Sequence, residues 1–271
     1  MADFSVLLSV YHKESPVFLR QSLDSIFDQT LLPTEVVIVK DGPLTSTLEE
    51  VIDYYISTHT STIKIVSLPV NVGLGTALHE GLKHCNCELV ARMDTDDIAK
   101  PTRFEMQVKV FSDYPDISVV GTWTDEFVDD KMNIVSVRKL PENQDEIYAF
   151  AKRRNPINHP TVMFKKRDVL SVGGYQHFFL FEDYCLWVRM LIKGYHFYNI
   201  PVCLLYFRMS PDVYKRRGGF KYAVTEYKLR RLMWNLHFIS LDDFLWETPL
   251  RFIIRILPSK LRRYFYQKVL R

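Results

Sequence analysis

The sequence has no long uninterrupted run of apolar residues. None of its hydrophobic segments approaches about 18 residues, the length at which a segment predicts a transmembrane helix. The apolar stretch FSVLLSV near the start is short and has no basic residue before it. It therefore predicts a first β-strand and not a signal peptide.

Cysteine is scarce and its spacing does not suit a metal site. The four cysteines, Cys85, Cys87, Cys185 and Cys203, form no Cys-x-x-Cys pair, and the close pair is too tightly spaced for a usual zinc half-site. Reduced thiols in a cytosolic compartment are the simplest interpretation. Internal repeats and low-complexity segments are also absent. With 47% hydrophobic and 25% charged residues, the composition indicates one large globular domain, or one domain with an appendage.

Acidic residues are rare in the last part of the chain. Residues 215–271 hold 14 Lys and Arg but only 4 Asp and Glu, a net charge of +10, whereas residues 1–214 carry −7. This asymmetry indicates an acidic body with a basic tail that meets an anionic partner. No nucleic-acid-binding motif is present, so we expect no nucleic-acid partner.

Strand-like and helix-like segments alternate in the first third of the chain. Near-continuous apolar strands that alternate with helices are typical of an α/β fold with a mostly parallel sheet flanked by helices. Beyond about residue 115 we expect further strands in 116–129 and 133–140, and a helix from about Glu182. The first predicted strands are residues 4–10, 34–43, 62–68 and 87–94, with helices at 16–30, 48–57 and 74–85.

Polar residues follow three of these strands, where open α/β sheets bind ligands. They are residues 11–14, Asp41 and the acidic run at Asp94, Asp96 and Asp97. Carboxylates this close repel one another unless a cation lies between them. Oxygen ligands suit Mg²⁺ or Mn²⁺, which often bridge a few protein carboxylates to phosphates. The run therefore predicts a divalent-cation site, and the alternative is a solvated loop that caps the following helix.

A glycine-containing segment, NVGLGTALHEG at 71–81, begins like a dinucleotide-binding fingerprint. Gly73 and Gly75 fit that spacing, but Leu78 stands where the third glycine belongs. Two interpretations stay open. The loop either lets the backbone pass close to a nucleotide, or is a turn into a helix that needs glycine geometry.

Several blocks in order resemble a known family. LLSVYHKES, EVVIVKDGP, NVGLGTALHEGL, ARMDTDD, VGGY and FEDYCLWVRM are similar to family-2 glycosyltransferases of GT-A fold, over roughly residues 3–210. VKDGP, ARMDTDD, NPINHPTVMF and FEDYCLW most resemble bacterial enzymes that build O-antigen and exopolysaccharide repeat units. Several of those are galactosyltransferases acting on sugar-diphosphate-undecaprenyl acceptors. The resemblance implies a GT-A domain at 1–210, with a nucleotide-sugar half (1–115) and an acceptor half (116–210), before a basic amphipathic helical tail at 211–271.

The resemblance also implies roles for the strand-end residues. Asp41 would contact uracil, although Lys40 stands where the family has a second acid. Asp94 and Asp96 would hold the metal, with Asp96 the more direct ligand, and Asp97 extends the motif. The implied donor-binding residues are Tyr11, Glu14, Asp41, Asn71, Arg92, Asp94 and Asp96.

The resemblance places catalysis at Glu182 and Asp183, with Asp183 as the general base that deprotonates the acceptor hydroxyl. The alternative is favourable negative charge at a helix N-terminus. His159 could touch the diphosphate, the acceptor or the metal, or be structural. Trp187 could stack on a sugar, but core packing is the stronger interpretation.

The tail interleaves basic and apolar residues. A stripe of Phe252, Ile253, Ile256 and Leu257, with Arg251 and Arg255 beside it, fits an interfacial helix on an anionic membrane. The alternative is a helical appendage that packs on the body and exposes a basic face.

These features together predict a metal-dependent, inverting glycosyltransferase at the cytoplasmic face of the cell membrane. It would move a hexose, foremost galactose from UDP-galactose, onto a GlcNAc- or GalNAc-diphosphate-lipid, with Mn²⁺ or Mg²⁺ as cofactor. Two other classes stay open: a nucleotidyltransferase that makes a nucleotide-sugar, and a non-catalytic membrane-associated scaffold.

Overall fold

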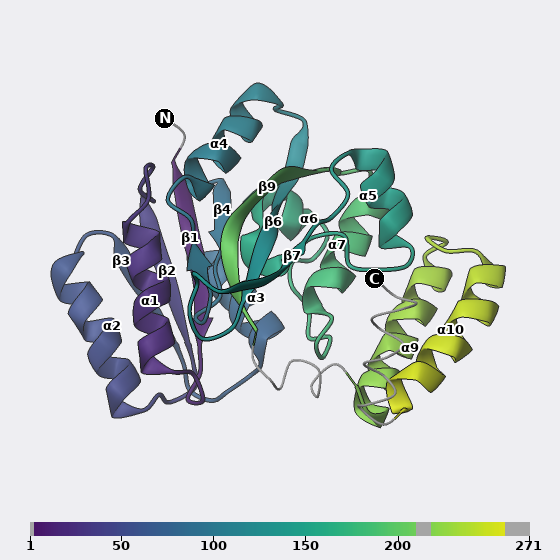
Figure 1. Cartoon of the computed structure of the whole chain (residues 1–271), viewed down its shortest axis with the longest axis horizontal. Helices are drawn as coiled ribbons and strands as arrows, with labels where there is room; N and C mark the ends of the chain where they lie inside the picture. Colours follow the sequence, from purple (N-terminus) through teal and green to yellow (C-terminus); the bar gives the residue numbers. More distant parts are fainter. Residues whose placement is uncertain (1–2, 210–217, 258–271) are drawn as a thin grey trace.

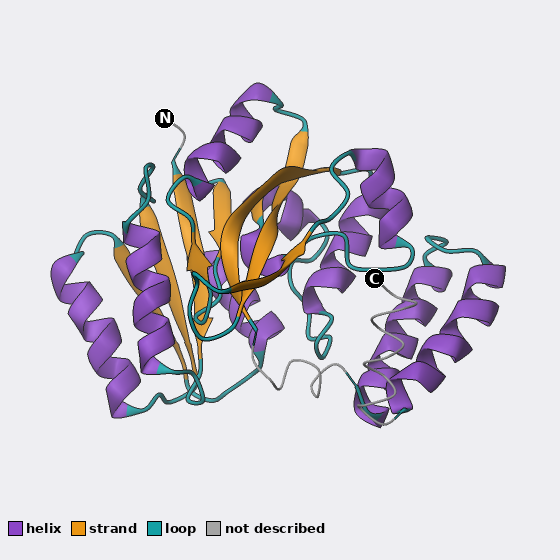
Figure 2. Ribbon diagram, in the orientation of Figure 1, coloured by secondary structure: helices purple, strands orange, loops and turns teal. Residues whose placement is uncertain are grey.

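A mixed nine-stranded sheet forms the centre of the protein (Figures 1 and 2). The computed structural model describes residues 3–209 and 218–257. The strand order is β3-β2-β1-β4-β8-β6-β9-β5, and β7 pairs with β6. The strands are β1 (Phe4–Val10), β2 (Glu35–Asp41), β3 (Ile63–Leu68), β4 (Leu89–Arg92), β5 (Ile98–Ala99), β6 (Ile117–Phe127), β7 (Ile134–Arg138), β8 (Met163–Lys165) and β9 (His196–Arg208).

Helices cover both faces of the sheet (Figure 2). The α-helices are α1 (Pro16–Phe27), α2 (Ser46–Thr58), α3 (Leu74–His84), α4 (Arg103–Asp113), α5 (Gln144–Ala151), α6 (Lys166–Ser171), α7 (Glu182–Ile192), α9 (Phe220–Asn235) and α10 (Leu241–Ile256). A short 3₁₀ helix, η1, spans His159–Thr161.

Alternating side chains of the first strands feed two separate cores, because successive strand residues point to opposite faces. In β1, Leu7 packs with α3 and α7 on one face. Leu8, the next residue, packs with α1, α2 and α4 on the other. The strands β1 to β4 pair in parallel. The predicted α/β sheet flanked by helices is therefore confirmed, and its parallel part is the N-terminal half.

The second half of the sheet is mixed. β8 runs antiparallel to both β4 and β6, whereas β6 and the long β9 are parallel. The long strand β9, whose interior contains Pro201, was not predicted from the sequence. The β6–β9 register shifts at Thr122 and Trp123, opposite the stretch from Ile200 to Cys203. A bulge of this kind is where a strand tolerates proline.

The helices α9 and α10 pack against each other beside the sheet domain (right side of Figure 1). A capping box begins α10, in which Ser240 and Asp243 bond to each other's backbone N–H. The ring of Tyr222 on α9 lies 4.9 Å from that of Phe181, the residue before α7. Arg230 donates a hydrogen bond of 2.6 Å to the carbonyl of Lys152, just after α5. The pair is thus attached to the segments that follow α5 and precede α7.

The arginines of α10 do not form the exposed basic edge that the sequence suggested. Arg255 is buried, and its guanidinium bonds to both carboxylate oxygens of Glu226 at 2.6 and 3.1 Å. Arg251 is also mostly covered and pairs with Glu226 and Glu247 at 3.5 Å. No helix within residues 3–209 and 218–257 is long and apolar enough to cross a membrane.

Candidate active site

Three carboxylates gather where β4 ends. The carboxylate oxygens of Asp94, Asp96 and Asp97 all lie within 4.8 Å of one another. Asp94 and Asp96 are half-buried, whereas Asp97 is fully buried. Burial, followed by the charges of Asp96 and Asp94, raises the pKa of Asp97 well above its usual value.

This cluster has the donor set that a hard divalent cation requires. Besides the carboxylates, it has one buried oxygen, Asp97 Oδ2, that lacks a hydrogen-bond partner within the described parts of the chain. A cation would relieve the repulsion among the three acids and the desolvation of that oxygen. The residues present therefore fit a bound divalent cation.

A buried arginine lies under the cluster. Arg92 is 2% exposed, and its Nη2 pairs with Asp94 Oδ1. Its Nε and Nη1 groups have no hydrogen-bond partner among the described residues. A second buried arginine, Arg103, donates from Nη2 to the Arg92 carbonyl at 2.7 Å. Burial lowers the pKa of Arg103 to about 9, and the charge of Arg92 acts in the same direction.

The end of β9 supports the cluster from the other side. The backbone N–H of Arg208 donates to Asp97 Oδ1, and its Nε donates to the Asp96 carbonyl, each at 2.8 Å. The Arg208 guanidinium also lies 4.0 Å from the ring centre of Phe18. Sequence reasoning missed Arg208. The apolar run that leads up to it was the available signal for a strand ending at the site.

The predicted nucleotide-side residues follow the neighbouring strands β1, β2 and β3. Asp41, at the end of β2, accepts hydrogen bonds from the N–H groups of Val72 at 2.7 Å and Gly73 at 3.1 Å. Asn71 Nδ2 donates to the Asp41 carbonyl at 3.3 Å. Asp41 is 3% exposed, so in this structure it anchors the loop that leads to α3.

Tyr11 and Glu14 form the turn that follows β1. The Glu14 N–H donates to the Tyr11 carbonyl at 3.1 Å, and both residues are half-buried. Because β3, β2, β1 and β4 are neighbours in that order, their carboxyl ends share one edge. The predicted donor-binding residues therefore lie along the same edge of the sheet as the acidic cluster.

The predicted catalytic pair occupies the first turn of α7. Asn155 Nδ2 donates to Asp183 Oδ2 at 2.5 Å, a contact that the sequence did not suggest. Burial raises the pKa of Asp183, whereas Asn155 and the nearby charge of Arg92 oppose that rise. Burial also raises the pKa of Glu182 to about 7. A carboxylate with a raised pKa is a stronger base, which suits general-base chemistry.

Gly75 explains how the nucleotide-side loop comes close to this pair. A Cβ at Gly75 would lie 2.7 Å from Glu182 Cγ and 2.8 Å from the Gln176 carbonyl oxygen. The first turn of α3 therefore packs directly on the residue beside Asp183. This contact is with protein and not with a nucleotide. Gly73, the N-cap of α3, has a φ of 86°, so the interpretation as a turn into a helix that needs glycine geometry fits that position.

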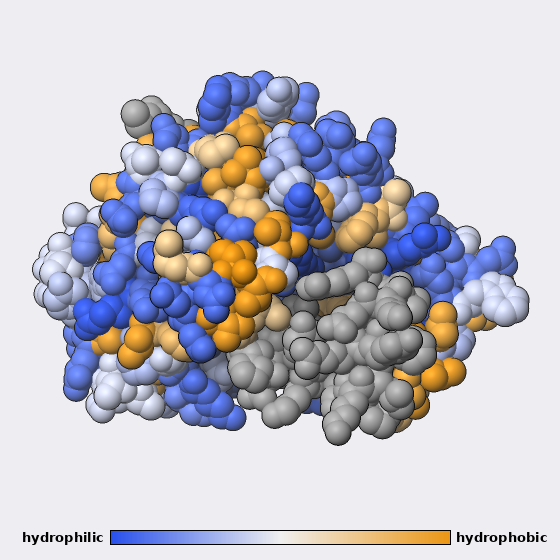
Figure 3. Space-filling model, viewed as in Figure 1, coloured by the Kyte–Doolittle hydropathy of each residue, from blue (hydrophilic) through white to orange (hydrophobic). Residues whose placement is uncertain are grey.

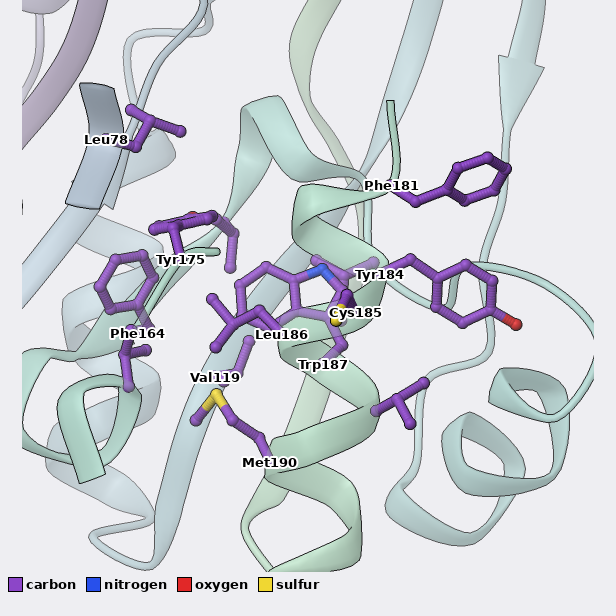
Figure 4. Packing of buried hydrophobic residues seen from close by; sticks show 14 of the residues in the cluster. Leu78, Val119, Phe164, Tyr175, Phe181, Tyr184, Cys185, Leu186, Trp187 and Met190 are labelled. Atoms are coloured by element: carbon purple, nitrogen blue, oxygen red, sulfur yellow. The ribbon is translucent and has the colours of Figure 1, made fainter. Parts of the chain in front are cut away.

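His159 and Trp187 lie on the buried side of the site. His159 Nε2 is 2.9 Å from the Tyr175 hydroxyl. Burial, and then the charge of Arg92, holds the pKa of His159 well below its usual value. Trp187 is fully buried in the core, among residues such as Leu186 and Met190 (Figure 4). Its Nε1 has no hydrogen-bond partner among the described residues. The indole thus packs in the core, where no sugar can stack on it.

Comparison with known proteins gives a family and close relatives. The model of the family "Glycosyl transferase family 2" matches residues 5–174. A UDP-Gal:alpha-D-GlcNAc-diphosphoundecaprenol beta-1,3-galactosyltransferase of Escherichia coli is 40% identical, over 99% of this chain and 96% of that protein. The amylovoran biosynthesis glycosyltransferase AmsE of Erwinia amylovora is 37% identical, over 98% of each chain.

Solved structures share the fold at low sequence identity. TarS of S. aureus, residues 1–349 in complex with UDP-GlcNAc, superposes with a TM-score of 0.68 at 16% identity, over 98% of this chain and 76% of that one. The mannosyltransferase PcManGT of Pyrobaculum calidifontis, in complex with GDP-Man and Mn²⁺, gives a TM-score of 0.65 at 17% identity, over 98% and 75%. These matches confirm the GT-A fold. Since the family model covers most of the chain and the relatives cover nearly all of it, the protein belongs to glycosyltransferase family 2.

Proposed function

We propose that the protein is a metal-dependent, inverting galactosyltransferase that moves galactose from UDP-galactose onto a GlcNAc- or GalNAc-diphosphate-lipid. The relative that is 40% identical over 99% of the chain has a UDP-galactose donor and a GlcNAc-diphosphoundecaprenol acceptor in its name. The setting that we propose is the synthesis of an O-antigen or exopolysaccharide repeat unit, because other relatives work in such syntheses.

One observation in the site carries the proposal. The buried Arg92 guanidinium pairs with Asp94, and its positive charge partly opposes the rise in the pKa of Glu182 and Asp183 that burial causes. Its charge thus acts on the acidic cluster and on the predicted base together. A glycosyl transfer needs both at once, because a base must act on one side of the anomeric carbon and positive charge on the other.

In the proposed reaction, Asp183 accepts the proton of the acceptor hydroxyl as that oxygen attacks the anomeric carbon. The bond from the anomeric carbon to the UDP oxygen breaks, and UDP leaves with the bonding electron pair. Asn155 orients the Asp183 carboxylate through its 2.5 Å hydrogen bond. One displacement at the anomeric carbon inverts its configuration, so no covalent enzyme intermediate is needed.

Asp94 and Asp96 are the residues that would hold the metal, which we propose to be Mn²⁺ or Mg²⁺. When bound, the ion supplies positive charge for the leaving diphosphate. Tyr11, Glu14 and Asp41 would line the nucleoside side, and Asn71 would lie near the ribose or diphosphate.

We further propose that the enzyme works at the cytoplasmic face of the cell membrane as a peripheral protein. A lipid-linked acceptor requires access to a bilayer. The net charge of +10 in residues 215–271 would attract anionic lipids.

The function is tested by UDP release from a panel of UDP-sugars, with a short-chain, water-soluble GlcNAc- or GalNAc-diphosphate-lipid as acceptor. Parallel reactions contain Mn²⁺, Mg²⁺ or EDTA. We expect release that requires the acceptor, is highest with UDP-galactose and is abolished by EDTA. Release of pyrophosphate from a nucleoside triphosphate and sugar phosphate would instead identify a nucleotidyltransferase. UDP binding without turnover of any donor would favour a scaffold.

A further inference from the structure

The outer side of α10 is apolar although the helix belongs to a basic tail. Six apolar residues of α10 are exposed to solvent: Trp246 by 81% and the other five by 49 to 58%. At 3.6 residues per turn they fall within about half of the helix circumference. We call this surface the insertion face; it consists of Leu241, Leu245, Trp246, Leu250, Ile253 and Ile256. Figure 3 shows apolar residues gathered at the lower right edge of the molecule, where α10 lies in Figure 1.

The charged residues of α10 lie mainly on the opposite side. Arg251 and Arg255 point toward α9, where they pair with Glu226, and Glu247 pairs with Arg230 at 3.3 Å. These arginines form ion pairs inside the protein, so they are not available to bind an external anion. The helix is therefore amphipathic in the reverse sense to an ordinary surface helix, with its ion pairs inward and its hydrocarbon outward.

A groove extends the insertion face toward α9. It has a volume of about 450 Å³, and its walls are almost entirely apolar. Tyr227 of α9 forms one wall, and Phe244, Pro249 and Phe252 of α10 form the other. A concave apolar surface next to a convex one can take hydrocarbon chains between the helices as well as over them.

We propose that the insertion face and this groove bind the hydrocarbon of a lipid bilayer, so that α10 lies within the membrane interface and not merely on its charged surface. Charge around the face fits this partner. Lys228 and Arg231 are exposed on α9, the helix that packs against α10, and such cations attract anionic headgroups. The sequence that follows α10, residues 258–271, has five basic and no acidic residues.

This inference rests on the proposed function, because an enzyme with a lipid-linked acceptor must reach a bilayer. The Tyr222–Phe181 contact joins the same pair of helices to the start of α7. An inserted α10 would therefore hold Glu182 and Asp183 at a fixed orientation to the membrane that carries the acceptor.

The test is co-sedimentation of the full-length protein with vesicles, either of neutral phosphatidylcholine or with added anionic lipid, over a range of salt. The double variant Leu250→Ser/Ile253→Ser removes apolar surface from exposed positions. We expect it to lower the vesicle partition coefficient roughly tenfold or more, because burial of apolar side chains dominates the binding. We expect wild-type binding to neutral vesicles to survive high salt. Met132→Ser is the matched control, since Met132 is also 81% exposed but lies between β6 and β7.

Three results would overturn the inference. The first is binding by the double variant that equals wild-type binding. The second is wild-type binding that requires anionic lipid and vanishes in salt, which would assign it to charge alone. A wild-type dimer that the double variant turns into a monomer would assign the face to a second copy. Turnover of the short-chain soluble acceptor, measured on the same samples, reports separately on the proposed function and on whether each variant is folded.

Discussion

At the scale of single residues, the positively charged side chain of Arg92 lies at the centre of the site. Arg92 is almost fully buried and pairs with Asp94. Its charge partly opposes the burial that raises the pKa of Glu182 and Asp183, and adds to the burial that lowers the pKa of His159. A buried charge is costly unless opposite charges surround it. Asp94 in the acidic cluster and the carboxyl groups of Glu182 and Asp183 supply negative charge around Arg92. The cluster and the predicted catalytic pair therefore both stabilise the same buried arginine.

Substituting the proposed base separates chemistry from donor binding. Asp183→Asn keeps the size of the side chain but cannot take the acceptor proton. We expect kcat to fall by roughly 10²- to 10⁴-fold while the affinity for UDP-galactose stays near wild type. Steady-state turnover and calorimetric titration of donor measure the two quantities.

The matched control is Asp113→Asn, an exposed acid at the end of α4, which should leave both quantities unchanged. Near-normal turnover by Asp183→Asn would remove the base assignment, whatever the control does.

The raised pKa of Glu182 predicts how stability depends on pH. Burial raises this pKa from 4.5 to about 7, so the folded state holds a proton that the unfolded state has lost. This contribution is complete below pH 4.5 and is lost as pH rises through 7. Glu182→Gln has no such titration. We expect its free energy of unfolding, relative to wild type, to be about 3 kcal/mol higher at pH 8 than at pH 4.

Urea unfolding of the ligand-free protein at the two pH values gives this difference. Glu146→Gln, at an exposed position of α5, controls for the general effect of removing a carboxylate. An equal response of the two variants would mean that Glu182 titrates as an ordinary surface acid.

The residues that the sequence could predict are those that lie next to one another in the chain. Asp94, Asp96 and Asp97 are adjacent to a recognisable strand, and Glu182 and Asp183 begin a recognisable helix. Arg103, Arg208 and Asn155 join the site only through tertiary contacts. No local pattern marks an arginine or an asparagine for such a contact.

At the scale of elements, the close approach of α3 and α7 brings the loop after β3 next to Glu182 and Asp183. Gly75 lies in the first turn of α3, and any side chain there would meet Glu182 and the carbonyl of Gln176. The position is helical, so the demand for glycine comes from space and not from backbone conformation.

Gly75→Ala therefore tests the packing contact between α3 and α7. The new methyl group must displace Glu182 or the loop before α7. We expect a loss of roughly 1 to 3 kcal/mol in the free energy of unfolding, together with a lower kcat. Thr76→Ala, one position along, is the control. A Gly75→Ala enzyme with wild-type stability and kcat would show that the contact has no role.

Elements were predictable where periodicity and composition agreed. β1 to β4 and α1 to α3 lie where continuous apolar runs and helical spacing predicted them. β9 was missed because Pro201 interrupts its pattern, and because its partner β6 is far away in the sequence. The inward direction of Arg251 and Arg255 was also beyond local reasoning, since their partner Glu226 belongs to another helix.

At the scale of the whole molecule, the acidic cluster follows β4, which lies beside β8 in the middle of the sheet. A donor that binds only the folded state stabilises the whole protein. Saturating UDP with Mn²⁺ should raise the melting temperature by ~5 to 10 °C, since a ligand at 100 times its Kd contributes roughly 2.7 kcal/mol.

The rise in melting temperature should depend on the proposed metal ligands and not on the proposed base. We expect Asp94→Asn/Asp96→Asn to lose it and Asp183→Asn to retain it, as measured by calorimetry with and without UDP and Mn²⁺. An undiminished shift in the Asp94→Asn/Asp96→Asn variant would contradict the placement of the metal and diphosphate.

The covalent structure of the reaction product shows whether the enzyme is an inverting galactosyltransferase. The protein is incubated with UDP-galactose, Mn²⁺ and GlcNAc-diphosphate-lipid, and the lipid is analysed by mass spectrometry and NMR. We expect one added galactose in β linkage, because a single displacement inverts the α configuration of the donor. An α-linked product, or an acceptor that gains no sugar while UDP-galactose is bound, would contradict this expectation.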